Sequence, residues 1–425
     1  MDEAPIFHRN NALAARRQLI VTGETGSQAY PPALSRGTTQ SGVRLYNERL
    51  ALSLIRRHGA LPKAEIARLT GLSAQTVSVI VRQLEGDGLL LRHKPQRGKV
   101  GQPLVPFALD PDGAFSIGLK VGRRSADLVL MDLTGALRKS VRRAYAFPAP
   151  AELLGFVRSG LTELVEDLKP KLRTRISGMG IAAPFELWNW EEEVGAPHDV
   201  LDAWRGFDLA AEIAVLCDWP VEFCNDATAA CSAELLFGKG REYRDFAYFF
   251  LGFFIGGGLV INGSVHHGRT GNAGALGSFP VPQPTGGAVQ LIRTASFYVL
   301  EQELKRQGKD PNMLWRNADD WSDVGPALDR WIAEAATSIA YAAAGVASAT
   351  EMVAAVIDGA MPGDVRAKLV SATSAALANI NMQGISPFSV VAGTIGADAR
   401  AMGAASLPLF ANYIIDRDVL FKEMA

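Results

Sequence analysis

Two adjacent polar residues, Asn225 and Asp226, have the types and the position to bind a ligand or to act in catalysis. They follow an apolar stretch, Val221 to Cys224, and precede an alanine-rich segment, which predicts a strand, a polar pair at its carboxyl end and a helix. Ligands of open α/β folds bind beyond the carboxyl ends of strands, so this pair is well placed to face a cleft. There the carboxylate could accept hydrogen bonds from ligand hydroxyls or serve as a general base. The alternative is that the pair only caps the helix.

The elements around this pair form a pattern that occurs twice. From Phe115 the sequence predicts three strands, with the first turn at Gly122 to Ser125. The same layout returns at Tyr248 to His266, with its first turn predicted at Gly256 to Gly258. A unit that occurs twice, each time followed by helices, is typical of an internal duplication. The sequence therefore predicts two α/β lobes with a cleft between them.

Several motifs in this region, in order and spacing, resemble the ROK family of bacterial sugar kinases and repressors. They are Asn225-Asp226-Ala227, Ala233-Glu234 before Phe237-Gly238, Leu251-Gly252 with Ile255-Gly256-Gly257-Gly258, Ile261-Asn262-Gly263, and Gly271-Asn272-Ala273-Gly274. The resemblance implies an α/β body of the actin-like, ribonuclease H-like kinase fold over residues 111–425. Its lobes would lie roughly at residues 111–226 plus the C-terminal helix, and at 227–400. Asp226 matches the family's catalytic base.

The amino-terminal quarter of the chain is basic, although the net charge of the whole is −1. Up to Val105, 15 Lys and Arg stand against 7 Asp and Glu, whereas the remainder has 28 against 37. A basic front on an acidic body is typical of a domain that contacts nucleic acid. Residues 1–43 show little periodicity and end in a Gly, Ser, Thr, Pro and Gln mixture, so we expect a flexible leader there.

Residues 44–110 have the pattern of a winged helix-turn-helix domain. A helix that ends at Gly59 is followed by a short helix, Lys63 to Leu69, a turn at Gly71 and a third helix. At offsets of three, four and seven, the third helix would bury Val77, Ile80, Val81 and Leu84. Two extended runs then flank a cationic loop, as in a wing. The alternative is a packing or dimerisation module with a solvated charged loop.

The basic charge and the wing together favour DNA binding. The third helix would enter the major groove, and the wing would contact phosphates or the minor groove. The candidate DNA-binding residues are Ser73, Gln75, Thr76, Ser78, Arg82, Lys94, Arg97 and Lys99. The unit also resembles the amino-terminal module of ROK repressors, which the family's simple kinases lack.

The sequence departs from the family's kinases where a phosphate would bind. The first turn, Asp-x-Gly-Gly-Thr in the kinases, is Lys120 to Arg124 here, with a cation in place of the carboxylate. The Thr-Gly that precedes Ile-Gly-Gly-Gly is replaced by Phe253-Phe254, and two aromatic rings would fill space that a phosphate needs. We therefore expect no catalytic residues and no cofactor, although Asp226 remains.

The residues that would hold a sugar also depart from the family pattern. Ala275 and Ser278 stand where family members carry the sugar-contacting Glu and His, and the loop 279–285 lacks the family's zinc-binding cysteines. His198, in the loop before Trp204, replaces the family's sugar-contacting Asn; the alternative is an exposed loop histidine. The candidate ligand-binding residues are His198, Asn225, Asp226 and Ser278.

The chain has three cysteines, Cys217, Cys224 and Cys231, without the close pairing of a metal site. They predict free thiols in a reducing cytoplasm and no bound metal. Three long runs without charged residues favour buried core over membrane spans, because glycine, proline or polar residues interrupt two of them and the third is short. The first residues lack the order of a signal peptide.

These observations favour a cytoplasmic, ligand-responsive transcriptional regulator, with repression the expected outcome. Its partners would be operator DNA, a sugar or sugar derivative as effector, and further copies of the chain in a homodimer or homotetramer. One alternative is an active ATP-dependent sugar kinase with a fused DNA-binding domain. Another is a constitutive DNA-binding protein whose body is purely structural.

Overall fold

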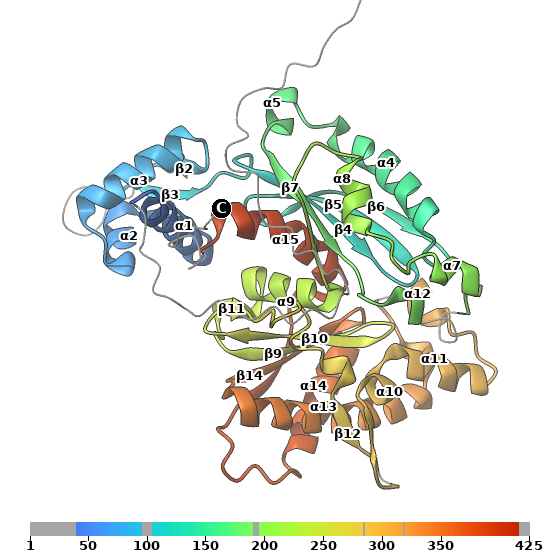
Figure 1. Ribbon diagram of the computed structural model, residues 1–425. Helices are drawn as coiled ribbons and strands as arrows, with labels where there is room; N and C mark the ends of the chain where they lie inside the picture. Colours follow the sequence, from blue (N-terminus) through green and yellow to red (C-terminus); the bar gives the residue numbers. More distant parts are fainter. Residues whose placement is uncertain (1–39, 96–103, 190–194, 284, 318, 416–425) are drawn as a thin grey trace, which may run out of the picture.

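The computed structural model describes residues 40–95, 104–189, 195–283, 285–317 and 319–415 (Figure 1). The leader predicted at residues 1–43 lies almost wholly outside these residues. Where the description begins, residues 40–43 already belong to the first helix. The chain then forms a small amino-terminal domain followed by a body with two sheets.

The amino-terminal domain is a winged helix. Its elements in order are α1 (Gln40–His58), β1 (Leu61–Pro62), α2 (Lys63–Thr70), α3 (Ala74–Gly86), β2 (Leu90–Arg92) and β3 (Pro106–Leu109). The strands form a sheet in the order β1-β3-β2. Gly71, at φ 71°, makes the left-handed turn after α2, and Ser73 caps α3. The predicted buried face of α3 is confirmed, because Val77, Ile80, Val81 and Leu84 are all buried.

The first sheet of the body defines lobe 1. Its strands are β4 (Phe115–Val121), β5 (Ser125–Asp132), β6 (Leu137–Ala144), β7 (Ile176–Ala182) and β8 (Val221–Cys224). They lie in the order β6-β5-β4-β7-β8, with antiparallel pairing on the β6 side and parallel pairing on the β8 side. Helix α4 (Pro150–Glu166) packs on β5 and β6.

The second sheet defines lobe 2 and repeats this order. Its strands are β9 (Phe246–Leu251), β10 (Ile255–Ile261), β11 (Ser264–Val265), β14 (Ala354–Gly359) and β15 (Ser389–Ala392). The order β11-β10-β9-β14-β15 again places an antiparallel meander beside two parallel strands. The duplication predicted from the sequence is therefore present in the fold.

Three glycines in lobe 2 do not form the turn that the sequence predicts for them. Gly256, Gly257 and Gly258 lie inside β10, and the turn between β9 and β10 is at residues 252–254. A Cβ atom at Gly256 would lie 2.7 Å from the Cβ of Ala227, and one at Gly258 would lie 2.6 Å from that of Cys231. The glycines therefore allow a helix to approach the strand closely, rather than allowing the chain to reverse.

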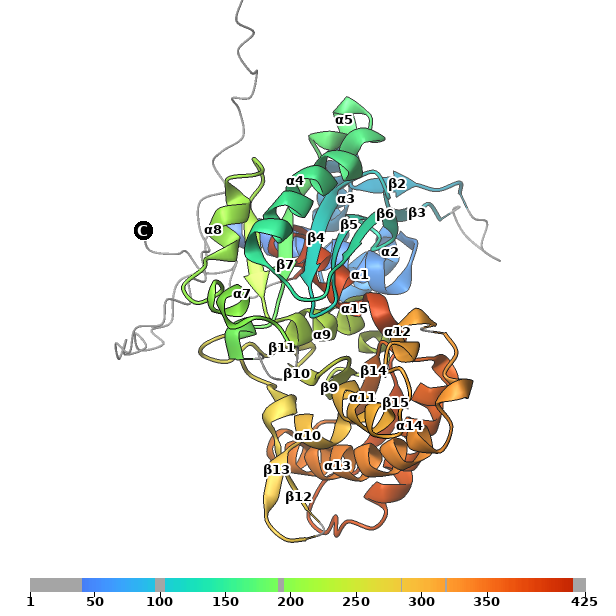
Figure 2. The ribbon, with the colours of Figure 1, turned by 90° about the vertical axis from the view of Figure 1, so that its right-hand side faces the viewer.

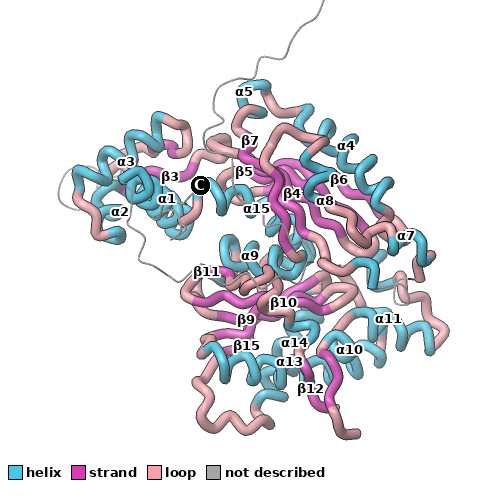
Figure 3. Tube along the Cα trace, viewed as in Figure 1, coloured by secondary structure: helices cyan, strands magenta, loops and turns pink. Residues whose placement is uncertain are grey.

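Two helices separate the sheets: α9 (Asp226–Phe237) and α15 (Ala399–Tyr413). Helix α15 packs on β4 and β7 of lobe 1, and α9 packs on β10 of lobe 2. The two helices also pack on each other, so closely that a Cβ atom at Gly403 would overlap the carbonyl group of Ala229. The layers therefore follow as lobe 1 sheet, α15, α9 and lobe 2 sheet (Figure 3).

The outer face of lobe 2 is covered by helices that include α11 (Phe297–Arg306), α13 (Pro326–Thr350) and α14 (Gly363–Leu377). Helix α13 is long and apolar enough to cross a membrane by length and composition, but 61% of its apolar window is buried inside the protein. Its buried residues pack in the core of lobe 2. Beside α13, β12 (Pro280–Pro282) and β13 (Ala288–Gln290) form a hairpin (Figure 2).

Candidate functional site

A cavity of about 310 Å³ lies between the two lobes. Its walls come from the β4–β5 turn, the first turn of α9, the β9–β10 turn, the segment 272–278 and the start of α15. This volume falls at the lower end of the range of small-molecule sites, which is roughly 300 to 1,000 Å³. The cavity therefore has the size for a small ligand such as a sugar.

Asn225 and Asp226 both line this cavity, as expected from their position after β8. Asn225 also caps α9, since its Oδ1 accepts hydrogen bonds from the backbone N–H groups of Ala227 at 3.0 Å and Thr228 at 3.4 Å. The capping interpretation and the cleft interpretation are both correct for Asn225. Its Oδ1 is occupied by the cap, so a ligand would meet its amide NH₂ group.

Asp226 forms an ion pair that the sequence analysis missed. Arg400 Nη1, on the first turn of α15, donates a hydrogen bond to Asp226 Oδ2 at 3.2 Å. The two side chains are 17% and 18% exposed, and both line the cavity. The guanidinium group of Arg400 also lies over the ring of Phe250, 4.9 Å from its centroid. An isolated arginine in an otherwise uncharged helix was the available signal, but nothing local indicated its partner.

The other two predicted ligand-binding residues lie in different places. Ser278 lines the cavity at the end of a short 3₁₀ helix, Leu276–Ser278. His198 is exposed at the start of α7 (His198–Asp202) and is not among the described residues that line the cavity. Trp204 is buried, and its Nε1 donates to Pro148 O at 2.9 Å. The segment that holds His198 thus packs along lobe 1 rather than turning into the cavity.

The cations Lys120, at the end of β4, and Arg123, in the turn that follows, have different surroundings. Lys120 is buried in lobe 1, where its Nζ donates to Asp127 Oδ2 at 2.8 Å and to Ser125 Oγ at 2.9 Å. Burial, together with the nearby charge of Arg400, lowers the pKa of Lys120 to about 8. Arg123, in contrast, lines the cavity.

An aromatic cluster forms the wall next to Arg123. The Arg123 guanidinium group lies 4.2 Å from the ring centroid of Phe253. Tyr298 packs against Phe253 and Phe254, with ring centroids 5.5 and 5.9 Å apart. These rings and the guanidinium group occupy the side of the cleft on which the β4–β5 turn and the β9–β10 turn face each other.

The predicted DNA-binding residues of α3 lie on its outer side. Ser73, Gln75 and Arg82 are exposed, and Thr76 and Ser78 are partly exposed. Ser73 Oγ accepts a hydrogen bond from the backbone N–H of Thr76 at 3.1 Å, and Lys63 Nζ lies 3.4 Å from Ser78 Oγ. Lys94 is exposed beyond β2, whereas Arg97 and Lys99 lie outside the described residues.

The three cysteines are free thiols in separate elements. Burial raises the pKa of each thiol, which keeps Cys217, Cys224 and Cys231 protonated near neutral pH. Within the described part of the chain, no group of three or more His, Cys, Asp or Glu residues could hold a metal ion. The absence of zinc stays a prediction.

Comparison with known families matches both parts of the chain. Residues 116–297 match the model of the ROK family, and residues 46–99 match that of the MarR family. The chain carries a ROK domain behind a MarR-type winged helix. The family expected from the sequence motifs is thereby confirmed.

Two curated relatives illustrate the range of this similarity. The uncharacterized protein y4fQ of Sinorhizobium fredii is 23% identical over 86% of this chain and 91% of its own length. The xylose repressor of Bacillus subtilis is 24% identical, over 57% of this chain and 62% of the repressor. This second match therefore spans somewhat less than two thirds of the repressor.

Solved structures show the same ROK fold. A ROK family transcriptional regulator, a homologue of the Escherichia coli MLC protein, has a TM-score of 0.61 at 18% identity and covers 88% of this chain and 97% of its own. A ROK family glucokinase from Streptomyces griseus has a TM-score of 0.54 at 21% identity and covers 69% of this chain and 99% of its own. The body thus shares its architecture with regulators and with kinases, and function must be decided from the site.

Proposed function

We propose that this ROK protein is a transcriptional repressor that binds operator DNA through its winged helix and responds to a small polyhydroxylated effector bound between its lobes. The observation that carries the proposal is the union of two features in one chain. One is a winged helix whose α3 presents polar residues outward, and the other is an interlobe cavity that Asp226 and Asn225 line.

The residues of the cavity support a sugar or sugar derivative as the effector class. The carboxylate of Asp226 accepts hydrogen bonds from hydroxyl groups, and Asn225 and Ser278 can donate them. The relatives that are named xylose repressor and N-acetylglucosamine repressor point in the same direction. The protein would act in the cytoplasm, as a dimer or tetramer on its operator.

We further propose that the body senses its ligand without phosphorylating it. A kinase of this fold needs a turn that positions phosphate and magnesium, a second turn for the nucleotide, and a base. Here Lys120, at the end of β4 before the first turn, is paired to Asp127, and Phe253 and Phe254 of the second turn pack at steep angles against Tyr298. Asp226 remains in place as a possible base, but it is paired to Arg400.

A thermal-shift screen with sugars, sugar phosphates and polyols tests the sensor. A ligand at about 100 times its dissociation constant adds ~2.7 kcal/mol to the free energy of unfolding, which raises the melting temperature measurably. The compound that shifts the melting temperature should also lower the affinity of the protein for DNA selected from a random pool. Failure of every compound to alter DNA binding would favour a constitutive DNA-binding protein.

The kinase alternative has a separate test. The protein is incubated with ATP, magnesium and each sugar of the same panel, and ADP release is measured. We expect no turnover above the background without sugar. Turnover at an enzyme-like rate, about 1 s⁻¹ or more, would instead support a sugar kinase with a fused DNA-binding domain.

A further inference from the structure

The Arg400–Asp226 ion pair joins the two lobes at the wall of the cavity. Asp226 begins α9, which packs on lobe 2, and Arg400 lies in the first turn of α15, which packs on lobe 1. The pair is thus one of the contacts across the boundary between α9 and α15, and both of its residues line the cavity. The pair therefore connects the two helices that pack on the opposite lobes.

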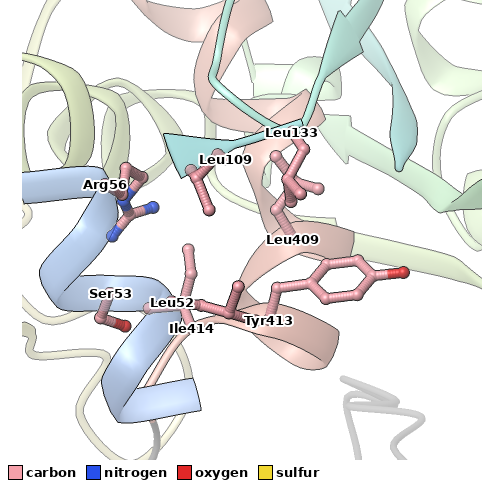
Figure 4. Close-up of a pocket in the computed structure, with 8 residues that line it drawn as sticks. All are labelled: Leu52, Ser53, Arg56, Leu109, Leu133, Leu409, Tyr413 and Ile414. Carbon is pink, nitrogen blue, oxygen red and sulfur yellow. The ribbon is translucent and has the colours of Figure 1, made fainter. Parts of the chain in front are cut away.

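The far end of α15 contacts the winged helix. Arg49 Nη2 of α1 donates a hydrogen bond to Ala411 O at 2.6 Å, and the backbone N–H of Ile415 donates to Ser53 Oγ at 3.1 Å. Tyr413 packs against the core of the winged helix, and its hydroxyl group bonds Ser177 of β7. Figure 4 shows Leu52, Ser53 and Arg56 of α1 beside Tyr413 and Ile414 at the end of α15.

Helix α15 therefore extends from the cavity to the DNA-binding domain. Arg400 and Tyr413 lie about 20 Å apart along the axis, from a rise of 1.5 Å per residue. Pro408 has no backbone N–H group to donate within the helix, but its ring lies close to Gly178 of β7, so this part of α15 is held against lobe 1. A movement of the first turn of α15 relative to α9 would therefore also shift the other end of α15, which contacts α1.

A ligand and Arg400 would compete for the carboxylate of Asp226. A ligand hydroxyl group that donates to Oδ2 occupies the atom that now accepts from Arg400. The guanidinium group also lies over the face of the Phe250 ring, and this contact does not depend on the carboxylate, so it can hold the group when the ion pair opens. A ligand that draws Oδ2 away from Arg400 would weaken the ion pair, and by linkage the ion pair would weaken the binding of that ligand to the same extent.

We propose that the Arg400–Asp226 ion pair is a ligand-sensitive latch between the lobes, and that α15 transmits its state to the winged helix. The latch is closed in the ligand-free protein, which holds the winged helix in the arrangement that binds the operator. A hydroxyl-bearing ligand on Asp226 opens it and lowers operator affinity. This inference rests on the proposed repressor function and adds the residues that link effector to DNA.

The test uses full-length protein, without ligand, and a duplex selected by the wild-type protein from a random pool. Fluorescence anisotropy measures the affinity for this duplex and for a random duplex. We expect Arg400→Gln and Asp226→Ala each to reduce affinity for the selected duplex roughly five-fold or more, within the usual range of coupling between sites. Affinity for the random duplex should change little. The double variant should lose no more affinity for the selected duplex than whichever single variant binds it more weakly, because the two substitutions remove the same ion pair.

Two further variants separate the latch from a general loss of structure. Arg400→Lys keeps the charge and should recover most of the affinity that Arg400→Gln loses. Arg205→Gln removes an exposed Arg–Asp pair on lobe 1, away from the cavity, and should behave like wild type. Circular dichroism and the melting temperature establish that each variant is folded. If Arg400→Gln is unfolded, Arg400→Lys and Asp226→Ala decide the question.

Ser53→Ala tests the far end of α15. It removes the acceptor for the Ile415 N–H group, and we expect a smaller effect of sugar on DNA binding while the thermal shift with the same sugar is unchanged. Unchanged or increased affinity of folded Arg400→Gln for the selected duplex would overturn the latch. If wild type then still responds to a sugar, the repressor function stands without the latch. If wild type selects no DNA sequence, the proposed function itself fails.

Discussion

Replacing Asp226 by Asn removes a charge from the cavity wall while keeping the shape of the side chain, and we expect this change to weaken effector binding. The carboxylate accepts from Arg400 at 3.2 Å and lines the cavity. An amide oxygen still accepts a hydrogen bond, but without the charge that makes such bonds stronger. The loss should therefore appear in the ligand's dissociation constant.

The expected magnitude follows from the exposure of the site. A hydrogen bond to a charged group contributes about 1.5 to 3 kcal/mol and a neutral one about 0.5 to 1.5 kcal/mol, so losing the charge of one such bond costs about 1 to 2.5 kcal/mol. The Asp226 side chain is 18% exposed, so water screens part of its charge, and the lower part of that range applies. A loss of ~1 to 2 kcal/mol corresponds to a dissociation constant about 5 to 30 times higher.

Isothermal titration calorimetry with a sugar identified by the thermal-shift screen measures this change. Asp202→Asn is the matched control, because Asp202 pairs with Arg205 on the surface of lobe 1 and is 47% exposed. An unchanged dissociation constant for Asp226→Asn would refute the role of its carboxylate in ligand binding. If wild type phosphorylates a sugar and Asp226→Asn abolishes that turnover, Asp226 is a general base and the protein is a kinase.

The remaining predictions concern DNA, metal and pH. Arg82→Ala should cost roughly 1 to 3 kcal/mol on selected DNA and little on random DNA, whereas Lys94→Ala should weaken both and reduce the salt slope by about 1; equal losses for Arg82→Ala on both would remove it from base recognition. Elemental analysis after dialysis should find no stoichiometric zinc, and one zinc per chain would contradict this. The pKa of Lys120 is lowered to about 8 on folding, so the unfolded chain binds more protons between pH 8 and 10.5. Over that window the free energy of unfolding should rise for wild type relative to Lys120→Met, by up to about 3 kcal/mol, in urea titrations; no difference in slope would refute the shift.

The sequence by itself determined the elements whose signals are local. The spacing of Val77, Ile80, Val81 and Leu84 gave the buried face of α3, because a period of 3.6 residues needs no knowledge of the rest of the chain. The repeated strand pattern likewise predicted two α/β lobes, and the two sheets have the same strand order. Position after a strand was enough to place Asn225 and Asp226 at the cleft.

Tertiary packing decided the features that depend on contacts between distant segments. Gly256 and Gly258 are of a residue type that is common in turns, yet they lie in β10. There α9 approaches the strand too closely to leave room for a side chain. Arg400 meets Asp226 across 174 residues of sequence, and the packing of α15 against α9 alone brings them together. His198 was predicted to bind the ligand because its loop resembles the family's sugar-contacting loop, but its segment packs along lobe 1. Residue types and periodicity report the local environment of each element, whereas the pairs that form the cavity wall depend on how the layers meet.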